Sequence, residues 1–255
     1  EGEYLNGKRN GKGKEYNYYN LIFEGEYLNG ERNGKGREYD RNGKLIYEGE
    51  YLFGDRHGKG KEYDRNGKLI SEGEYSIGKI WNGKVKDNLF EGEYLNGKIN
   101  GKVKEYNFEG QLEFEGEYLD GERNVKGKEY KYYGKFKLEF EGEYLNGKKW
   151  NGKEKNYDNG KLTFEGEYLN GKRNVKGREY NYDDKLIYEG EYLNEKRNGK
   201  GKEYNYDDKL IFEGEYLNGK RNGRGEEYNF DGKLIFEGEY LNGERIYGIW
   251  YFKNG

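Results

Sequence analysis

The 255-residue sequence contains no cysteine, no proline and no methionine, and it has a single histidine. Without cysteine there is no disulfide or thiolate metal ligand, and one histidine is too few for a common zinc site. His57 lies at a repeated loop position that Asn10 and Asn33 occupy elsewhere, which gives no support for a Ser-His-Asp triad. We therefore expect no metal, no cofactor and no enzymatic activity.

Long apolar runs and blocks of one charge are also missing. Hydrophobic residues make up 31% of the chain and charged residues 38%, with a net charge of −3. No apolar run approaches the roughly 20 residues of a membrane-spanning helix. Because Lys and Arg alternate with Glu and Asp throughout, the sequence offers no basic surface for a phosphate backbone, and we expect no nucleic-acid partner.

Aromatic residues and glycine are abundant instead. Aromatics reach 18% of the chain, and there are 44 glycines at regular spacing. Low hydrophobicity alone favours disorder, but each buried ring removes a large area from water. The composition therefore indicates an ordered chain with an aromatic core.

The tetrapeptide EGEY occurs eleven times, usually 24 residues apart, and sets the period of the chain. In the unit 212–235, Asn218-Gly219 and Asp231-Gly232 each predict a hairpin turn with positive φ at both central residues. The segments between them are rich in Tyr, Phe and Ile and show no helical periodicity. We predict two strands per unit, hence an elongated single-layer antiparallel meander with ~4.8 Å between strands and a length on the order of 100 Å.

Alternation along each strand predicts which side chains share a face. Phe236, Gly238 and Tyr240 lie on one face, which we expect to be packed, with a neighbouring ring covering the glycine. Tyr204 and Tyr206 are expected to extend the same stack of rings. The other face carries rows of Glu, which we expect to pair with Lys across strands.

The pairs of carboxylates in the EGEY segments have two interpretations. Glu189 and Glu191 lie on one strand face, where a pair of carboxylates could hydrolyse a glycoside or hold a hard cation. Eleven equivalent copies make a unique catalytic pair implausible. We interpret them as a solvated charged face.

An aromatic-Glu-Gly-x-aromatic motif occurs at residues 47–51 (YEGEY). It is followed by a Gly-x-x-x-Gly-x-Gly motif at residues 54–60 (GDRHGKG). This pattern resembles the MORN (membrane occupation and recognition nexus) repeat family, including MORN variant repeats, and the resemblance covers the whole chain. It implies an all-β, elongated, twisted antiparallel sheet of about eleven hairpins. It also implies a scaffold, a membrane-apposition module or a protein-docking module.

We expect one continuous repeat array over residues 1–255, a piece of a longer chain. The units near 73–91 and 116–141 are irregular because they have 19 and 26 residues instead of 24. The repeat pattern is lost at 245–255, where we expect a cap over the last strand, since terminal repeats protect an exposed edge.

Three classes of function remain after these exclusions. The favoured one is a non-enzymatic scaffold that docks protein partners and forms a homo-oligomer through edge strands or ends, inside the cell and associated with membrane or cytoskeleton. A phospholipid headgroup binder is the alternative, disfavoured by the balanced charge. A carbohydrate-binding repeat protein ranks third because the chain has only three Trp. The candidate interaction surface comprises the rings Trp81, Trp150, Tyr204, Tyr206 and Trp250.

Overall fold

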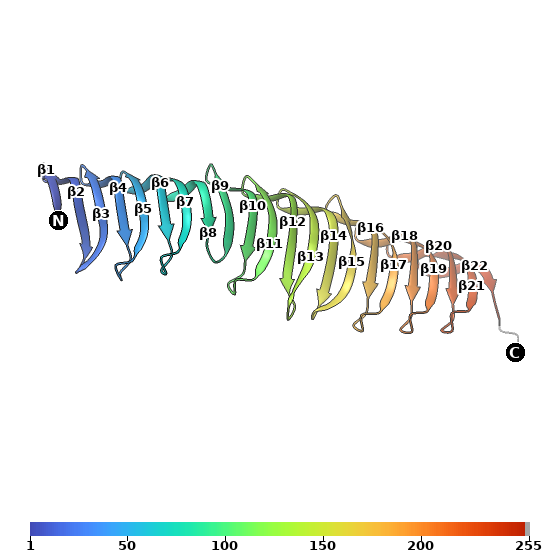
Figure 1. The fold of residues 1–255 in the computed structure, drawn as a ribbon. Helices are drawn as coiled ribbons and strands as arrows, with labels where there is room; N and C mark the ends of the chain where they lie inside the picture. The colour runs from blue at the N-terminus through green and yellow to red at the C-terminus, as the bar shows by residue number, and fades with distance from the viewer. Residues whose placement is uncertain (253–255) are drawn as a thin grey trace. The chain divides into compact units, whose positions relative to one another are not determined.

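The computed structural model describes residues 1–252 as 22 β-strands, in the antiparallel meander that the repeat predicts. The chain divides into two compact units, the first over Glu1–Glu122 and the second from Arg123 onward. Within each unit, every strand is hydrogen-bonded to the next strand in the sequence (Figure 1). Within residues 1–252 no helix is long and apolar enough to cross a membrane.

The strands of the first unit are β1 (Gly2–Leu5), β2 (Lys8–Asn17), β3 (Asn20–Leu28), β4 (Glu31–Tyr39), β5 (Leu45–Leu52), β6 (Asp55–Tyr63), β7 (Leu69–Ser76), β8 (Lys79–Lys86), β9 (Phe90–Leu95), β10 (Lys98–Tyr106) and β11 (Leu112–Leu119). The remaining strands are β12 (Glu122–Tyr132), β13 (Phe136–Leu145), β14 (Lys148–Asp158), β15 (Lys161–Leu169), β16 (Lys172–Tyr180), β17 (Leu186–Leu193), β18 (Lys196–Tyr204), β19 (Leu210–Leu217), β20 (Lys220–Tyr228), β21 (Leu234–Leu241) and β22 (Glu244–Trp250).

The odd-numbered strands bend sharply at the glycine of EGEY. In β19 the ring centroids of Phe212 and Tyr216 are 5.6 Å apart, although residues four apart on a straight strand are separated by about 13 Å. The two rings therefore meet on the inside of a bend at Gly214. A Cβ added at Gly214 would lie 2.6 Å from Phe212 Cζ and 2.7 Å from the Cα of Gly225 on the next strand. Only glycine allows this approach.

The bends place all core rings on one side of the sheet. Phe212 also contacts Tyr240 of the following repeat, at 5.2 Å between centroids, and both rings are buried. Phe236 and Tyr240 repeat the arrangement at 5.6 Å. Edge-to-face contacts of this kind add stabilisation beyond the area buried. The predicted packed face of aromatics and glycine is confirmed.

The two turn types of the repeat are different, and one expectation was wrong. Asn218 and Gly219 have φ values of 52° and 89°, as a type I′ turn requires. At the other turn, Gly232 has a φ of 79° but Asp231 does not adopt positive φ. The side chain of Asn229 closes that longer loop, because its Oδ1 accepts the N–H groups of Asp231 and Lys233 at 3.0 and 2.9 Å. An Asx turn therefore takes the place of a primed turn.

The glycine at the bend generates a prediction. A Cβ added at Gly166 would lie 2.5 Å from Phe164 Cζ. We expect Gly166→Val to destabilise the chain by about 1–3 kcal/mol or more, because the ring has no free space to move into. Urea denaturation measures the change. The control is Lys176→Val at an exposed position of β16, which should change stability by less than about 0.5 kcal/mol. Equal effects of the two substitutions would show that Gly166 is not packed.

Candidate functional site

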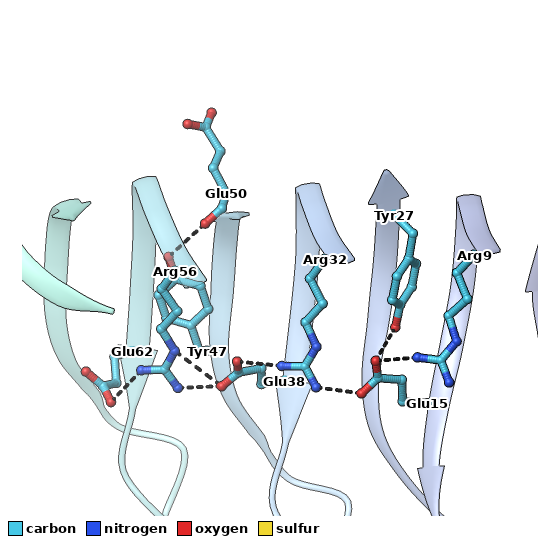
Figure 2. Close-up of polar contacts among 9 residues, drawn as sticks. All are labelled: Arg9, Glu15, Tyr27, Arg32, Glu38, Tyr47, Glu50, Arg56 and Glu62. Carbon is cyan, nitrogen blue, oxygen red and sulfur yellow. Dashed lines mark hydrogen bonds and ion pairs between the residues drawn. The ribbon is translucent and has the colours of Figure 1, made fainter. Parts of the chain in front are cut away.

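A ladder of alternating Arg and Glu side chains runs across the strands on the ring side of the sheet (Figure 2). Arg32 donates to Glu15 at 2.7 Å and to Glu38 at 3.1 Å. Arg56 donates to the other oxygen of Glu38 at 2.6 Å and to Glu62 at 3.0 Å. Each carboxylate between two arginines is therefore shared by neighbouring repeats, and the ion pairs form one network.

The ladder also covers the core. The guanidinium carbon of Arg32 lies 4.1 Å from the ring centroid of Phe23, and that of Arg56 lies 4.3 Å from the centroid of Tyr47. Both rings have no exposed surface. A guanidinium stacked on a ring adds a cation–π attraction and keeps water from the ring. The ring side of the sheet is therefore a closed core in this region and not an open groove.

The second unit repeats the ladder. Arg221 donates to Glu203 at 2.5 Å and to Glu227 at 2.6 Å, and its guanidinium lies 4.0 Å from the centroid of Phe212. Arg197 pairs with Glu179 at 2.5 Å and approaches Glu203 at 3.7 Å. Glu203 thus joins two arginines that belong to consecutive repeats.

The hydrogen bonds of the ladder determine the charge state of its members. Burial alone raises the pKa of Glu203, but hydrogen bonds from Arg221 and Tyr216 outweigh it and hold the pKa below the usual range. The same balance lowers the pKa of Glu179 beside Arg197. Burial, together with the hydrogen bond to Glu15, raises the pKa of Tyr27 to about 12. Glu179 and Glu203 are therefore charged, and Tyr27 is neutral, at neutral pH.

One repeat in the first unit lacks all three parts of this arrangement. Ser71 replaces the core ring and pairs with Val85, which replaces the glutamate. Ile80 replaces the arginine and packs against the core cluster of the first unit. The ring, the cation and the anion are all exchanged in this repeat. Ser71 Oγ makes hydrogen bonds to Glu62 and to Tyr75 instead.

The opposite side of the sheet carries the rows of Lys and Glu that the sequence predicts. Lys202 pairs with Glu213 at 3.1 Å and Lys61 with Glu72 at 3.2 Å. Between the rows, the backbone of the paired glycines forms the floor of an open groove, with a volume of about 1210 Å³ in the second unit. The predicted cross-strand pairs are confirmed. They are solvent-exposed, so each contributes little to stability.

Trp81 and Trp150 occupy shortened bulges. In most repeats one residue lies opposite three at the bulge, as between Gly214 and Tyr216. In the Trp81 and Trp150 repeats one residue lies opposite two. The Trp81 ring lies over Gly97 of the following turn and is 44% exposed. Trp150 lies beside the equivalent turn and is half-buried. Both rings are partly accessible to solvent.

Tyr204 and Tyr206 do not extend the stack of core rings, contrary to expectation. The register shifts between Glu203 and Tyr204, so the alternation of faces changes there. Tyr204 donates to Glu189 at 2.8 Å, on the charged side of the sheet. Tyr206 lies in the following turn and is 72% exposed. The bulge that displaces both residues has no distinct signature in the sequence.

Trp250 lies over the last core ring. Its centroid is 5.0 Å from that of Phe236, where other repeats place a glutamate. The guanidinium of Arg245 lies 4.5 Å from the centroid of Trp250, and the Phe252 ring stacks on Trp250 at 6.4 Å between centroids. These contacts are compatible with the predicted cap at 245–255, which stays a prediction. Residues 253–255 of that segment lie outside the described part of the chain.

The five predicted residues lie on different strands and turns. His57 lies on β6 and Glu189 on β17, within rows of equivalent side chains. In the described residues 1–252, no group of three or more His, Asp or Glu side chains could hold a metal ion. Sequence reasoning missed the Arg–Glu ladder. The signal for it was the recurrence of Arg and Glu six residues apart, as at 32 and 38 or 56 and 62.

The fold and the ladder together define an antiparallel β-hairpin repeat protein. The MORN repeat model matches residues 1–17, 90–102, 114–132, 164–184, 188–208 and 212–233. The MORN repeat variant model matches residues 32–52, 56–76 and 99–120. These matches cover more than half of the sequence, and the chain belongs to the MORN repeat family.

No curated protein matches the sequence significantly. Among solved structures, the crystal structure of TcdB2-TccC3 without its hypervariable C-terminal region is 12% identical with a TM-score of 0.25, over 86% of this chain and 12% of that one. The crystal structure of TcdB2-TccC3-TEV is 11% identical with a TM-score of 0.23, over 91% of this chain and 16% of that one. The present chain thus spans a small part of the length of both.

The ladder predicts a large difference between two nearby arginines. Arg221 bridges Glu203 and Glu227, whereas the side chain of Arg224 is 88% exposed. Arg221→Ala removes the guanidinium that Glu203 and Glu227 share and uncovers the Phe212 ring, so we expect a loss of about 3 kcal/mol in unfolding free energy. Arg224→Ala should cost less than about 0.5 kcal/mol. Urea denaturation of both variants is the measurement, and similar losses would contradict the ladder's role.

The lowered pKa values of Glu179 and Glu203 predict the acid stability of the fold. A carboxylate with a lower pKa in the folded state stabilises the fold fully above its unfolded pKa of about 4.3. This stabilisation is lost as the pH falls through the folded pKa. We expect the urea midpoint to stay level from about pH 7 to 5 and to decrease below about pH 4. A midpoint that rises on acidification would be incompatible with this sign.

Proposed function

We propose that this chain is a non-enzymatic scaffold that docks protein partners on side chains presented at fixed intervals. The observation that supports this proposal is the Arg–Glu ladder, in which Arg32 joins Glu15 to Glu38 and Arg56 joins Glu38 to Glu62. Because the ladder fixes each repeat against the next, equivalent side chains recur at about 10 Å, twice the spacing between strands.

The chemistry of the exposed surfaces favours protein as the partner. The groove side presents alternating Lys and Glu, such as Lys202 and Glu213, and alternating charge confers specificity on a protein interface. The shortened bulges add the accessible rings of Trp81 and Trp150. Partly exposed Trp side chains surrounded by polar groups are typical anchors of protein interfaces.

The same chemistry argues against catalysis. Each EGEY segment repeats the carboxylate pair of its neighbours. Glu189, a member of one such pair, already accepts hydrogen bonds from Tyr204 and Arg178 at 2.8 and 3.3 Å. Both hydrogen bonds come from protein side chains, so this carboxylate is held by structural contacts. We therefore assign the pairs a structural role.

A membrane-surface function is the second candidate, and it generates a negative prediction. Attraction to anionic headgroups requires clustered cations, but Lys61, Lys202 and Arg178 each pair with a glutamate on the groove side. We expect no sedimentation of the chain with vesicles of phosphatidylserine and phosphatidylcholine at about 0.15 M salt. Tight, salt-sensitive sedimentation would rank the membrane above a protein partner.

Affinity purification from the native source, followed by reconstitution with the purified partner, tests the scaffold. We expect Trp81→Ser and Trp150→Ser together to weaken partner binding by about tenfold or more, as interface anchors do. Phe53→Ser is the control, because Phe53 is 72% exposed in an unshortened repeat; it should bind normally. Undiminished binding by the Trp variant would refute docking at the shortened bulges.

A further inference from the structure

In each unit the longer turns form a row at one end of the strands, and we call this row of turns an edge. The turns are built in the same way in both units. Asp40 Oδ1 accepts the backbone N–H groups of Asn42 and Lys44 at 2.8 and 2.9 Å. Asn181 Oδ1 accepts those of Asp183 and Lys185 at 2.9 and 3.0 Å. The same holds at the turns that begin at Asp64 and Asn205. Identical hydrogen bonds give these turns the same conformation, so the second residue of each turn projects alike.

Neighbouring turns are joined in the same way in both units. Lys44 Nζ donates to the carbonyl oxygen of Arg65 at 2.8 Å, and Lys185 Nζ donates to the carbonyl oxygen of Tyr206. Arg65 and Tyr206 are therefore equivalent residues of equivalent turns. Adjacent turns are two strands apart, which gives the same step of about 10 Å along both edges.

The residues presented on the two edges are complementary. The first unit presents Arg41 and Arg65, both exposed, in turns DRNGK that each carry two bases and one acid. The second unit presents Tyr182 and Tyr206, which are 64% and 72% exposed, in turns NYDDK that each carry two acids and one base. Within residues 1–252, neither the Arg41 nor the Arg65 side chain has a hydrogen-bond or ion-pair partner.

We propose that two copies of this chain associate with the Arg41–Arg65 edge of one copy against the Tyr182–Tyr206 edge of the other. A guanidinium can stack on the face of an exposed Tyr while it donates hydrogen bonds to a neighbouring carboxylate such as Asp183. Neighbouring turns are one repeat apart on both edges. Formation of the first Arg–Tyr contact therefore aligns the second Arg with the second Tyr. Two weak contacts then add as a single bivalent interaction. This inference does not require a partner of another kind.

Charge exchange between the edges tests the proposal. We expect the wild-type chain to show concentration-dependent association by sedimentation velocity, weakened by salt. Arg41→Glu with Arg65→Glu should lower the association constant by about tenfold or more, and so should Asp183→Lys with Asp207→Lys. All four substitutions in one chain restore opposite charges and should recover association. The positions tolerate these changes because the turn hydrogen bonds of Asp183 and Asp207 use their backbone N–H groups.

The matched control is Lys79→Glu with Lys98→Glu, at exposed first positions of β8 and β10 that other repeats fill with Glu. This variant changes the net charge as much as the arginine variant but alters the opposite edge of the sheet. It should associate like the wild-type chain. A strictly monomeric wild-type chain, an equal effect of the control or no recovery in the fourfold variant would overturn the proposal. Binding of a soluble β-glucan to Tyr182 and Tyr206, without association, would assign the ring edge to carbohydrate and overturn it too.

Discussion

The close approach of paired glycines at the strand bends is the constraint on which the rest of the structure depends. At Gly214 and Gly225 the backbones lie so near that an added Cβ would be 2.7 Å from the opposite Cα. The approach lets each strand bend, and the bend brings Phe212 and Tyr216 together. Without it, a single-layer sheet with few aliphatic residues could not surround its rings, and their burial is its main source of stability.

The ladder solves the second problem of a single layer, which has no opposing layer to cover its core. Arg221 places a planar cation over Phe212 and is held there by Glu203 and Glu227. The long arginine side chain supplies apolar cover, while its charged end is satisfied by carboxylates. In the β7–β8 repeat, Ser71, Ile80 and Val85 stand in place of ring, cation and anion. There, Ile80 packs against the core cluster of the first unit.

The sequence predicted the strands, the meander and the packed face because these follow from the period, the turn dipeptides and the alternation of side chains. It predicted the Asn218-Gly219 turn, where the local residues alone decide the conformation. It failed at the Asp231-Gly232 turn, because the closing group is the Asn229 side chain two residues earlier. It failed at Tyr204 because the register shift beside Glu203 depends on pairing with another strand. The spacing of Arg and Glu six residues apart signals the ion pairs within a repeat, but the contacts that join one repeat to the next depend on the pairing of the strands.

The central claim is that the ladder in the second unit is a connected network and not a row of separate ion pairs. Arg197 and Arg221 belong to consecutive repeats and share Glu203, at 3.7 and 2.5 Å. A double-mutant cycle with Arg197→Ala and Arg221→Ala, followed by urea denaturation, measures the coupling free energy between the two side chains directly. The account predicts a coupling of at least about 0.5 kcal/mol, since both substitutions act on one carboxylate. Additive losses within experimental error would contradict a continuous network.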